Sequence, residues 1–86
     1  MGQIKKVVLD VLKPHKPTIL EMASSLSDED HKCTVNIKVA EVDEHTETLV
    51  VTLSGKNIDL EKISAKIAEL GGSIHSIDEV EVSLGS

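Results

Sequence analysis

The sequence contains no phenylalanine, tyrosine or tryptophan. Proteins that read single-stranded nucleic acids stack the bases on aromatic side chains, so this absence counts against such binding. Arginine is also absent, because all nine cationic residues are lysines, and the net charge is −6. Nucleic-acid phosphates and anionic membranes both select basic surfaces. We therefore expect neither a nucleic acid nor a membrane as partner, and a preference for cations or basic partners.

Cysteine is almost as scarce, since Cys33 is the only one, and an intramolecular disulfide is therefore excluded. The chain also lacks a run of 18 apolar residues and a recognisable signal peptide. These features lead us to expect a reducing, cytoplasmic compartment. We interpret Cys33 as a small apolar residue at the start of a strand, and not as a nucleophile.

Valine, isoleucine and leucine supply the core of an 86-residue chain, which we expect to form one domain, residues 1–86. Residues 4–12 predict a central strand that is apolar on both faces and stops at Lys13-Pro14. Asp10 is the single acid in this strand, and a buried charge needs a partner. We expect Asp10 to pair with Lys6 or Lys38, or else to bind a ligand.

The rest of the chain alternates helical and strand patterns. A capping box formed by Thr18 and Glu21 predicts a helix to about residue 27, followed by a polar loop to residue 32. Asp59 and Gly71-Gly72 predict the two ends of a second helix. Strands are predicted at 33–43, 47–54 and 73–84, with a bulge between His75 and Asp78 in the last.

The order strand, helix, strand, strand, helix, strand predicts an α+β ferredoxin-like sandwich. Its antiparallel sheet has the order 4-1-3-2, with both helices on one face. The other face has no helix and carries too many apolar residues for open water, which indicates an interface. We therefore expect a homo-oligomer, formed by face-to-face packing or by edge pairing into a ring. The residues expected on this face are Val8, Leu12, Ala40, Val42 and Val50.

This topology also gathers acids and histidines at one end of the sheet. The chance interpretation is that the rim of an acidic domain is polar anyway. The functional interpretation is a divalent-cation site. Carboxylates alone suit calcium or magnesium, which we expect over zinc, whereas added imidazoles would suit zinc, nickel or copper, and no sequence signature decides between the two sets. The rim residues are Asp10, His15, Asp43, Glu44, His45, Glu47 and His75, and the expected metal ligands are Asp10, Asp43, Glu44, Glu47, His75 and Asp78.

Several motifs together are similar to an archaeal family of unknown function, number 211 in the domain-of-unknown-function series. The resemblance covers nearly the whole chain and implies a ferredoxin-like fold and an oligomeric assembly. It brings no established activity, and it leaves metal binding by the acids open. The loop from Asp28 to Lys32 departs from the glycine-containing version associated with the family. The motifs are residues 8–17, 35–37, 41–43, 69–72 and 75–80.

We therefore expect a non-enzymatic, homo-oligomeric binding module that holds divalent cations at its subunit rims. The alternative is a regulatory domain of archaeal metabolism that senses a small ligand or binds a protein partner. An acylphosphatase-like enzyme would need an arginine for phosphate, and the chain has none. A cysteine–histidine nucleophile is also disfavoured, because Cys33 begins a strand at the end opposite to His15 and His75.

Overall fold

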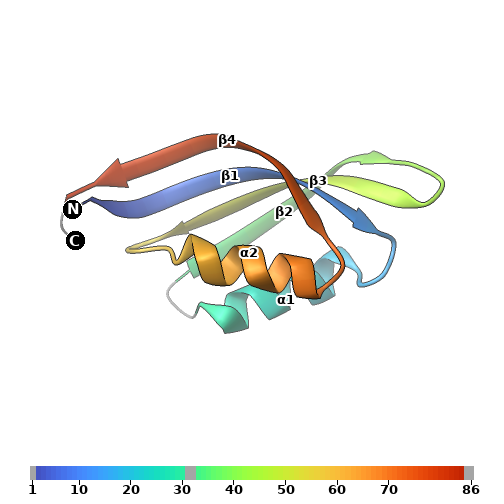
Figure 1. The fold of residues 1–86 in the computed structure, drawn as a ribbon, viewed down its shortest axis with the longest axis horizontal. Coiled ribbons are helices and arrows are strands. Elements are labelled where there is room, and N and C mark those ends of the chain that lie inside the picture. The colour runs from blue at the N-terminus through green and yellow to red at the C-terminus, as the bar shows by residue number, and fades with distance from the viewer. Residues whose placement is uncertain (1, 31–32, 85–86) are drawn as a thin grey trace.

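The computed structural model describes residues 2–30 and 33–84, which form two helices and four strands. They follow one another in the predicted order (Figure 1). Their bounds are β1 Gln3–Pro14, α1 Ile19–Glu29, β2 Cys33–Val42, β3 Thr46–Gly55, α2 Leu60–Glu69 and β4 Ser73–Ser83.

The four strands form one antiparallel sheet in the order β2-β3-β1-β4, which is the predicted order 4-1-3-2 counted from the other edge. Strand β1 is central and pairs with β3 on one side and β4 on the other, whereas β2 and β4 form the two edges. Together with the element order, this sheet defines a ferredoxin-like α+β fold.

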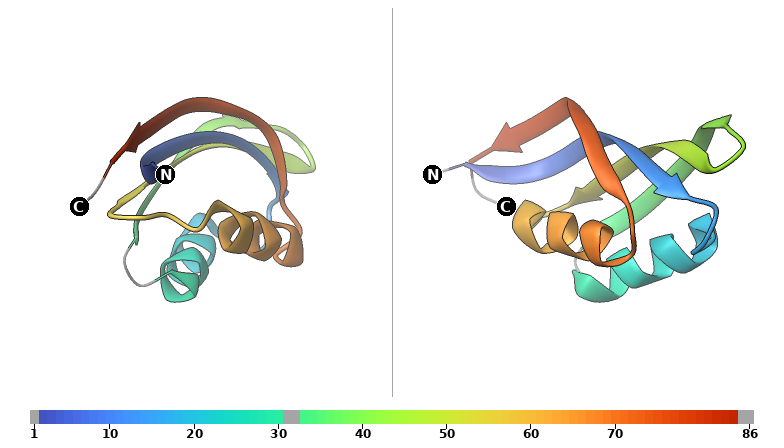
Figure 2. Two further views of the ribbon diagram at one scale, coloured as in Figure 1. Left: turned by 60° about the vertical axis from the view of Figure 1, so that its left-hand side comes forward. Right: turned by 45° about the vertical axis from the view of Figure 1, so that its right-hand side comes forward.

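Both helices cover the same face of the sheet, and the sheet curves over them (Figure 2). We call this the helix side and the opposite face the open side. Alternation along β1 points Val7, Leu9 and Val11 to the helix side, where all three are completely buried. The core between the layers is aliphatic apart from Met22 and Cys33, as a chain without aromatic residues requires.

The first helix begins at the predicted capping box. Thr18 Oγ1 accepts the Glu21 amide at 3.2 Å, and Glu21 Oε1 accepts the Thr18 amide at 2.8 Å. The helix ends at Glu29, two residues later than predicted, and the Asp30 amide still donates to the Leu26 carbonyl. Part of the polar loop predicted after residue 27 is therefore helical, and residues 31 and 32 lie outside the described residues.

The second helix has both predicted ends. The Asp59 side chain accepts the Lys62 amide at 3.2 Å, which satisfies one free donor of the first turn. After the helix, Gly71 adopts a φ of 90°, a left-handed conformation that glycine reaches without steric cost. Strand β4 then returns across the sheet beside β1.

Shifts of register in β4 confirm the predicted irregularity between His75 and Asp78. Leu9 pairs with Ile77 and Val8 with Glu79, which leaves Asp78 unpaired. A second shift follows at His75. Because each bulge adds one residue, Ile77 lies opposite Leu9 and takes its parity, on the helix side.

Strand β2 contains a bulge that the sequence alternation did not predict, and it corrects the expected position of one residue. Register shifts between Val39 and Glu41, so that Val42 pairs with Glu47. Glu47 shares its parity with the buried Leu49, so Val42 belongs to the helix side and not to the open side.

The sheet is longer than the helices that cover it. In Figure 1, β1 and β4 extend past α2 toward the termini, whereas the β2–β3 hairpin extends past the helices at the other end. The molecule measures 43 × 23 × 17 Å. Within residues 2–30 and 33–84, neither helix is long and apolar enough to cross a membrane.

Candidate functional site

The structure separates the predicted rim residues into groups on the two sides of the sheet. His15, Glu44 and Glu47 come together around Lys13, which continues the helix-side row of β1. Asp10 and His75 line a pocket with side chains of the open side. The strand register places both groups toward the same end of the sheet. The two groups nevertheless lie on opposite sides of the sheet, because Asp10 and Lys13 differ in parity along β1.

Lys13 is the organising residue of the first group. Its side chain is completely buried, and Nζ lies 2.8 Å from Oε1 of Glu47. The same ammonium donates to the carbonyls of Pro14 at 2.9 Å and Pro17 at 2.7 Å, with a longer contact to that of His15. A buried ammonium that is surrounded by acceptors in this way ties the β1–α1 loop to β3.

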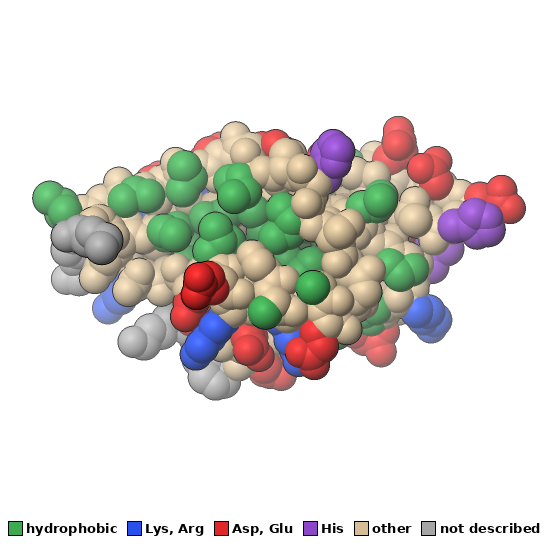
Figure 3. All heavy atoms as spheres, viewed as in Figure 1, with side chains coloured by type: hydrophobic (Ala, Val, Ile, Leu, Met, Phe, Trp, Pro, Cys, Tyr) green, Lys and Arg blue, Asp and Glu red, His purple; other side chains and the backbone are tan. Residues whose placement is uncertain are grey.

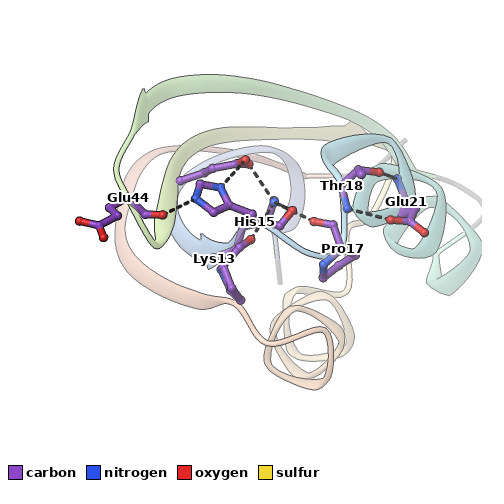
Figure 4. A network of polar contacts seen from close by, with 8 residues as sticks. Lys13, His15, Pro17, Thr18, Glu21 and Glu44 are labelled. Carbon is purple, nitrogen blue, oxygen red and sulfur yellow. Dashed lines mark hydrogen bonds and ion pairs between the residues drawn. The ribbon is translucent and has the colours of Figure 1, made fainter.

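His15 joins the loop to the β2–β3 hairpin. Its Nε2 lies 2.9 Å from the Glu44 carbonyl, and its Nδ1 lies 3.1 Å from Oε2 of Glu47 (Figure 4). Both neighbours are acceptors, so only an imidazolium ring donates to both. The hydrogen bond with Glu47 and then that with the Glu44 carbonyl hold the pKa of His15 above its ordinary value of 6.5.

Glu47 is shared between Lys13 and His15, one on each carboxylate oxygen. The hydrogen bond from Lys13 lowers the pKa of Glu47, and that from His15 lowers it further. As a metal ligand this carboxylate would have to leave one of these partners. Its position therefore favours a structural role in the single chain.

Sequence reasoning overlooked Lys13, although a signal was present. Val7, Leu9, Val11 and Lys13 share one parity, so the lysine continues the row that faces the core. The prediction ended the strand at Lys13-Pro14, whereas β1 continues through Pro14. A cation at the end of a buried row, with Glu47 opposite it in register, is the pattern that would have identified the pair.

The second group lines a pocket of about 280 Å³ on the open side. Its walls are Asp10 and Leu12 of β1, Thr48 of β3 and His75 of β4. Thr48 pairs with Leu12, so the two side chains stand next to each other across the strands. The pocket therefore combines one carboxylate, one imidazole and one hydroxyl with an aliphatic wall.

Asp10 does not have the lysine partner that the sequence predicted. Lys6 instead pairs with Glu79 at 3.1 Å. Lys38 is separated from Asp10 by Val50, which pairs with both, and two strand spacings amount to about 10 Å. Within residues 2–30 and 33–84, the side chain of Asp10 makes no hydrogen bond or ion pair. Its carboxylate is half-buried and faces the pocket without a protein counter-charge.

The remaining predicted ligands are exposed acids. Asp43 and Glu44 lie at the hairpin turn, and the Glu44 carboxylate is 3.6 Å from Nε2 of the exposed His45. Asp78 accepts a hydrogen bond from Ser76 at 2.7 Å. In the part of the chain that the structure describes, no three histidine, cysteine, aspartate or glutamate side chains form a group that could hold a metal ion.

Cys33 lies in the core, as expected for a small apolar residue at the start of a strand. Burial raises the pKa of its thiol, and the negative charge of Asp30 raises it further. A nucleophilic thiol needs the opposite shift. These surroundings give Cys33 no support as a catalytic residue.

A strip of exposed apolar side chains follows β4. Figure 3 shows hydrophobic side chains gathered along this strand and above α2. Ile77, Val80 and Val82 are each more than half exposed, and Leu84 continues the series just after the strand. Val80 pairs with the fully buried Val7, so this strip lies on the helix side, where α2 does not cover it.

Comparison with known proteins identifies the family. Residues 5–84 match the family called DUF211, described as "Uncharacterized ArCR", and the chain belongs to it. A curated relative is the uncharacterised protein MJ0319 of the archaeon Methanocaldococcus jannaschii. It is 49% identical over 80 residues, which cover 93% of this chain and 82% of the relative. The family assignment confirms the resemblance that the sequence motifs indicated.

Proposed function

We propose that the protein is a non-enzymatic, homo-oligomeric binding module whose subunits join through β4. The observation that carries this proposal is the exposed apolar strip of Ile77, Val80, Val82 and Leu84 on a strand that also forms an edge of the sheet. An edge strand that is long and apolar is a template for pairing with another chain. Apolar surface of this kind is commonly part of an interface.

The second edge of the sheet supports a head-to-tail arrangement. Strands β2 and β4 are the two edges and run in opposite directions, so β4 of one copy can pair with β2 of the next and extend the antiparallel sheet. Such a heterologous contact closes into a ring when the rotation permits. Lys38 of β2 would then approach the acidic edge that carries Glu79 and Glu81, whereas two β4 strands would bring like charges together. Face-to-face packing of the open sides is the other possible contact.

We further propose that the module binds divalent cations, calcium or magnesium rather than zinc, at its subunit rims. Support comes from the net charge of −6 and from the exposed acids Asp43, Glu44 and Asp78. These acids belong to the hairpin that follows β2 and to β4, the two elements that head-to-tail pairing would bring together. Since no group within one described chain suffices, the ligands of such a site would come from two subunits.

Native mass spectrometry of the untreated protein tests assembly and cation binding together. We expect a closed oligomer, and treatment with a chelator should remove whole calcium or magnesium ions or dissociate it. Val80→Lys should give monomers, because it places a charge in the apolar strip. Leu20→Lys is the matched control, since Leu20 is an exposed apolar residue of α1 away from β4. A monomeric wild-type protein would contradict the assembly, and an unchanged mass after chelation would contradict the cation.

The alternative is a regulatory domain that senses a small ligand or binds a protein partner. The same apolar strip favours it, because β4 could equally extend the sheet of a different protein. A monomeric wild-type protein that acquires a stoichiometric partner in a pull-down would support this function instead. In either case we propose a cytoplasmic location, in keeping with the single, unpaired and buried Cys33.

A further inference from the structure

We propose that the pocket formed by Asp10, Leu12, Thr48 and His75 binds a small organic cation, namely a primary ammonium group on a short hydrocarbon chain. This site is independent of subunit assembly and of the divalent cations proposed above. It rests on four side chains of one subunit and on the charge that they leave uncompensated.

The backbone creates the pocket through the irregular start of β4. Asp10 pairs with Ser76 and Val11 with Ile74, so His75 is the extra residue of a bulge. A bulge redirects the side chain of the unpaired residue. Here the redirected imidazole lines the same pocket as Asp10, on the side of the sheet that has no helix. Bulges are frequent beside functional sites for this reason.

The charge of the pocket selects a cation. Asp10 is half-buried, and its side chain makes no hydrogen bond or ion pair within the described residues. None of the described lysines lines the pocket, and Lys6 of the same strand is paired with Glu79. The carboxylate therefore has no counter-charge from the described protein residues, and a bound ammonium would supply one through a charge-assisted hydrogen bond. Thr48 Oγ1 and an unprotonated nitrogen of His75 are further acceptors for its other hydrogens.

The side chains that line the pocket favour an organic cation over a metal ion. Calcium takes six to eight oxygen ligands, and the pocket supplies one carboxylate and one hydroxyl. An ammonium donates only three hydrogen bonds and tolerates an apolar neighbour. Leu12 supplies an aliphatic wall for a hydrocarbon chain, and 280 Å³ leaves room for a short one.

The test is a titration of the 86-residue chain with n-butylammonium, monitored by the amide chemical shifts in NMR spectra. Butan-1-ol and butyrate are the matched neutral and anionic probes, and calcium chloride is added in a separate titration. We expect saturable shifts at Leu12, Thr48 and His75 with n-butylammonium alone. Asp10→Asn should weaken this binding by about tenfold or more, because it removes a charge-assisted hydrogen bond.

Glu81→Gln is the matched control, because it removes one acidic charge from β4 outside the pocket. It should leave the affinity for n-butylammonium unchanged. Equal shifts with n-butylammonium and butan-1-ol would overturn the proposal, and so would an equal loss of affinity in the two variants. Saturable shifts at these residues with calcium but not with n-butylammonium would overturn it in favour of a metal site. The three probes are compared on the wild-type protein, so this part of the test does not depend on the folding of a variant.

Discussion

The neighbouring strands β1 and β4 both carry aliphatic side chains on the helix side, but those of β1 are buried and those of β4 are exposed. Leu9 of β1 is completely buried, whereas Ile77, its partner in register on β4, is 55% exposed. Val7 and Val80 form a second pair of this kind. The helices lie over β1 and β3 and leave much of β4 uncovered. Hydrophobicity alone therefore does not distinguish a buried residue from an exposed residue here, and the coverage of the sheet by helices does.

The largest change in the free energy of unfolding should appear when Leu9 and Ile77 are each truncated to alanine. Leu9→Ala removes a fully buried side chain and should lower the free energy of unfolding by about 3 kcal/mol. Ile77→Ala should lower it by less than about 1 kcal/mol in the single chain, because solvent already reaches the side chain. Chemical denaturation at low protein concentration measures both.

The effects of the two substitutions on self-association should have the opposite order to their effects on stability. We expect Ile77→Ala to weaken self-association, which analytical ultracentrifugation over a concentration series would detect. If Ile77→Ala destabilises the monomer as strongly as Leu9→Ala, part of the chain covers β4 after all, and the strip is not an interface.

A comparison of two lysines of β1 should give the next largest effect. Lys13→Met leaves Glu47 and two loop carbonyls without their donor and should lower the free energy of unfolding by about 2–3 kcal/mol. Lys6→Met is the matched control, because its pair with Glu79 is exposed and worth less than about 1 kcal/mol. Urea denaturation of both variants checks the difference. Equal effects would mean that burial does not strengthen the Lys13–Glu47 pair.

The smallest effect should come from pH. The pKa of His15 is raised in the folded chain, so its contribution is complete below its ordinary value of 6.5 and is lost as the pH rises through the folded pKa. The pKa of Glu47 is lowered, so its contribution is present above 4.5 and is lost as the pH falls through the folded pKa. The two contributions overlap between these two ordinary values.

Urea denaturation from about pH 5.5 to pH 8 should therefore show a decline in stability with rising pH that His15→Gln reduces. His45→Gln should leave the decline unchanged, since His45 is exposed on the hairpin. An identical pH dependence in His15→Gln would contradict a raised pKa of His15 in the folded chain.

The sequence was sufficient for the parts of the molecule that depend on local chemistry. The Thr18–Glu21 capping box, the Asp59 cap and the glycines after α2 define helix ends through nearby hydrogen bonds and backbone freedom. The sheet order followed from the element order and the handedness of crossovers. The end of the first helix was misplaced by two residues, since Ser27-Asp28-Glu29 is as compatible with a last turn as with a loop.

The candidate site was predicted only as an end of the sheet, because topology gives the end at which residues meet. The side of the sheet depends on parity, and Asp10 and Lys13 differ in parity although they are close in sequence. A bulge changes the side of the sheet that the following residues face, and no glycine or proline in the sequence has to mark it. The bulge before Val42 is an example. The partner of Asp10 was predicted wrongly for a related reason, since Lys6 has an acid nearer to it on β4.

The enclosure of Lys13 has a consequence for its chemical reactivity. Acylating reagents must reach the amine that they attack, and the Nζ of Lys13 is enclosed while the loop carbonyls and Glu47 surround it. Exposed lysines such as Lys38 should react while Lys13 stays unmodified. Acylation of Lys13 would therefore record each opening of the β1–α1 loop, and its rate would report how often this end of the sheet comes apart.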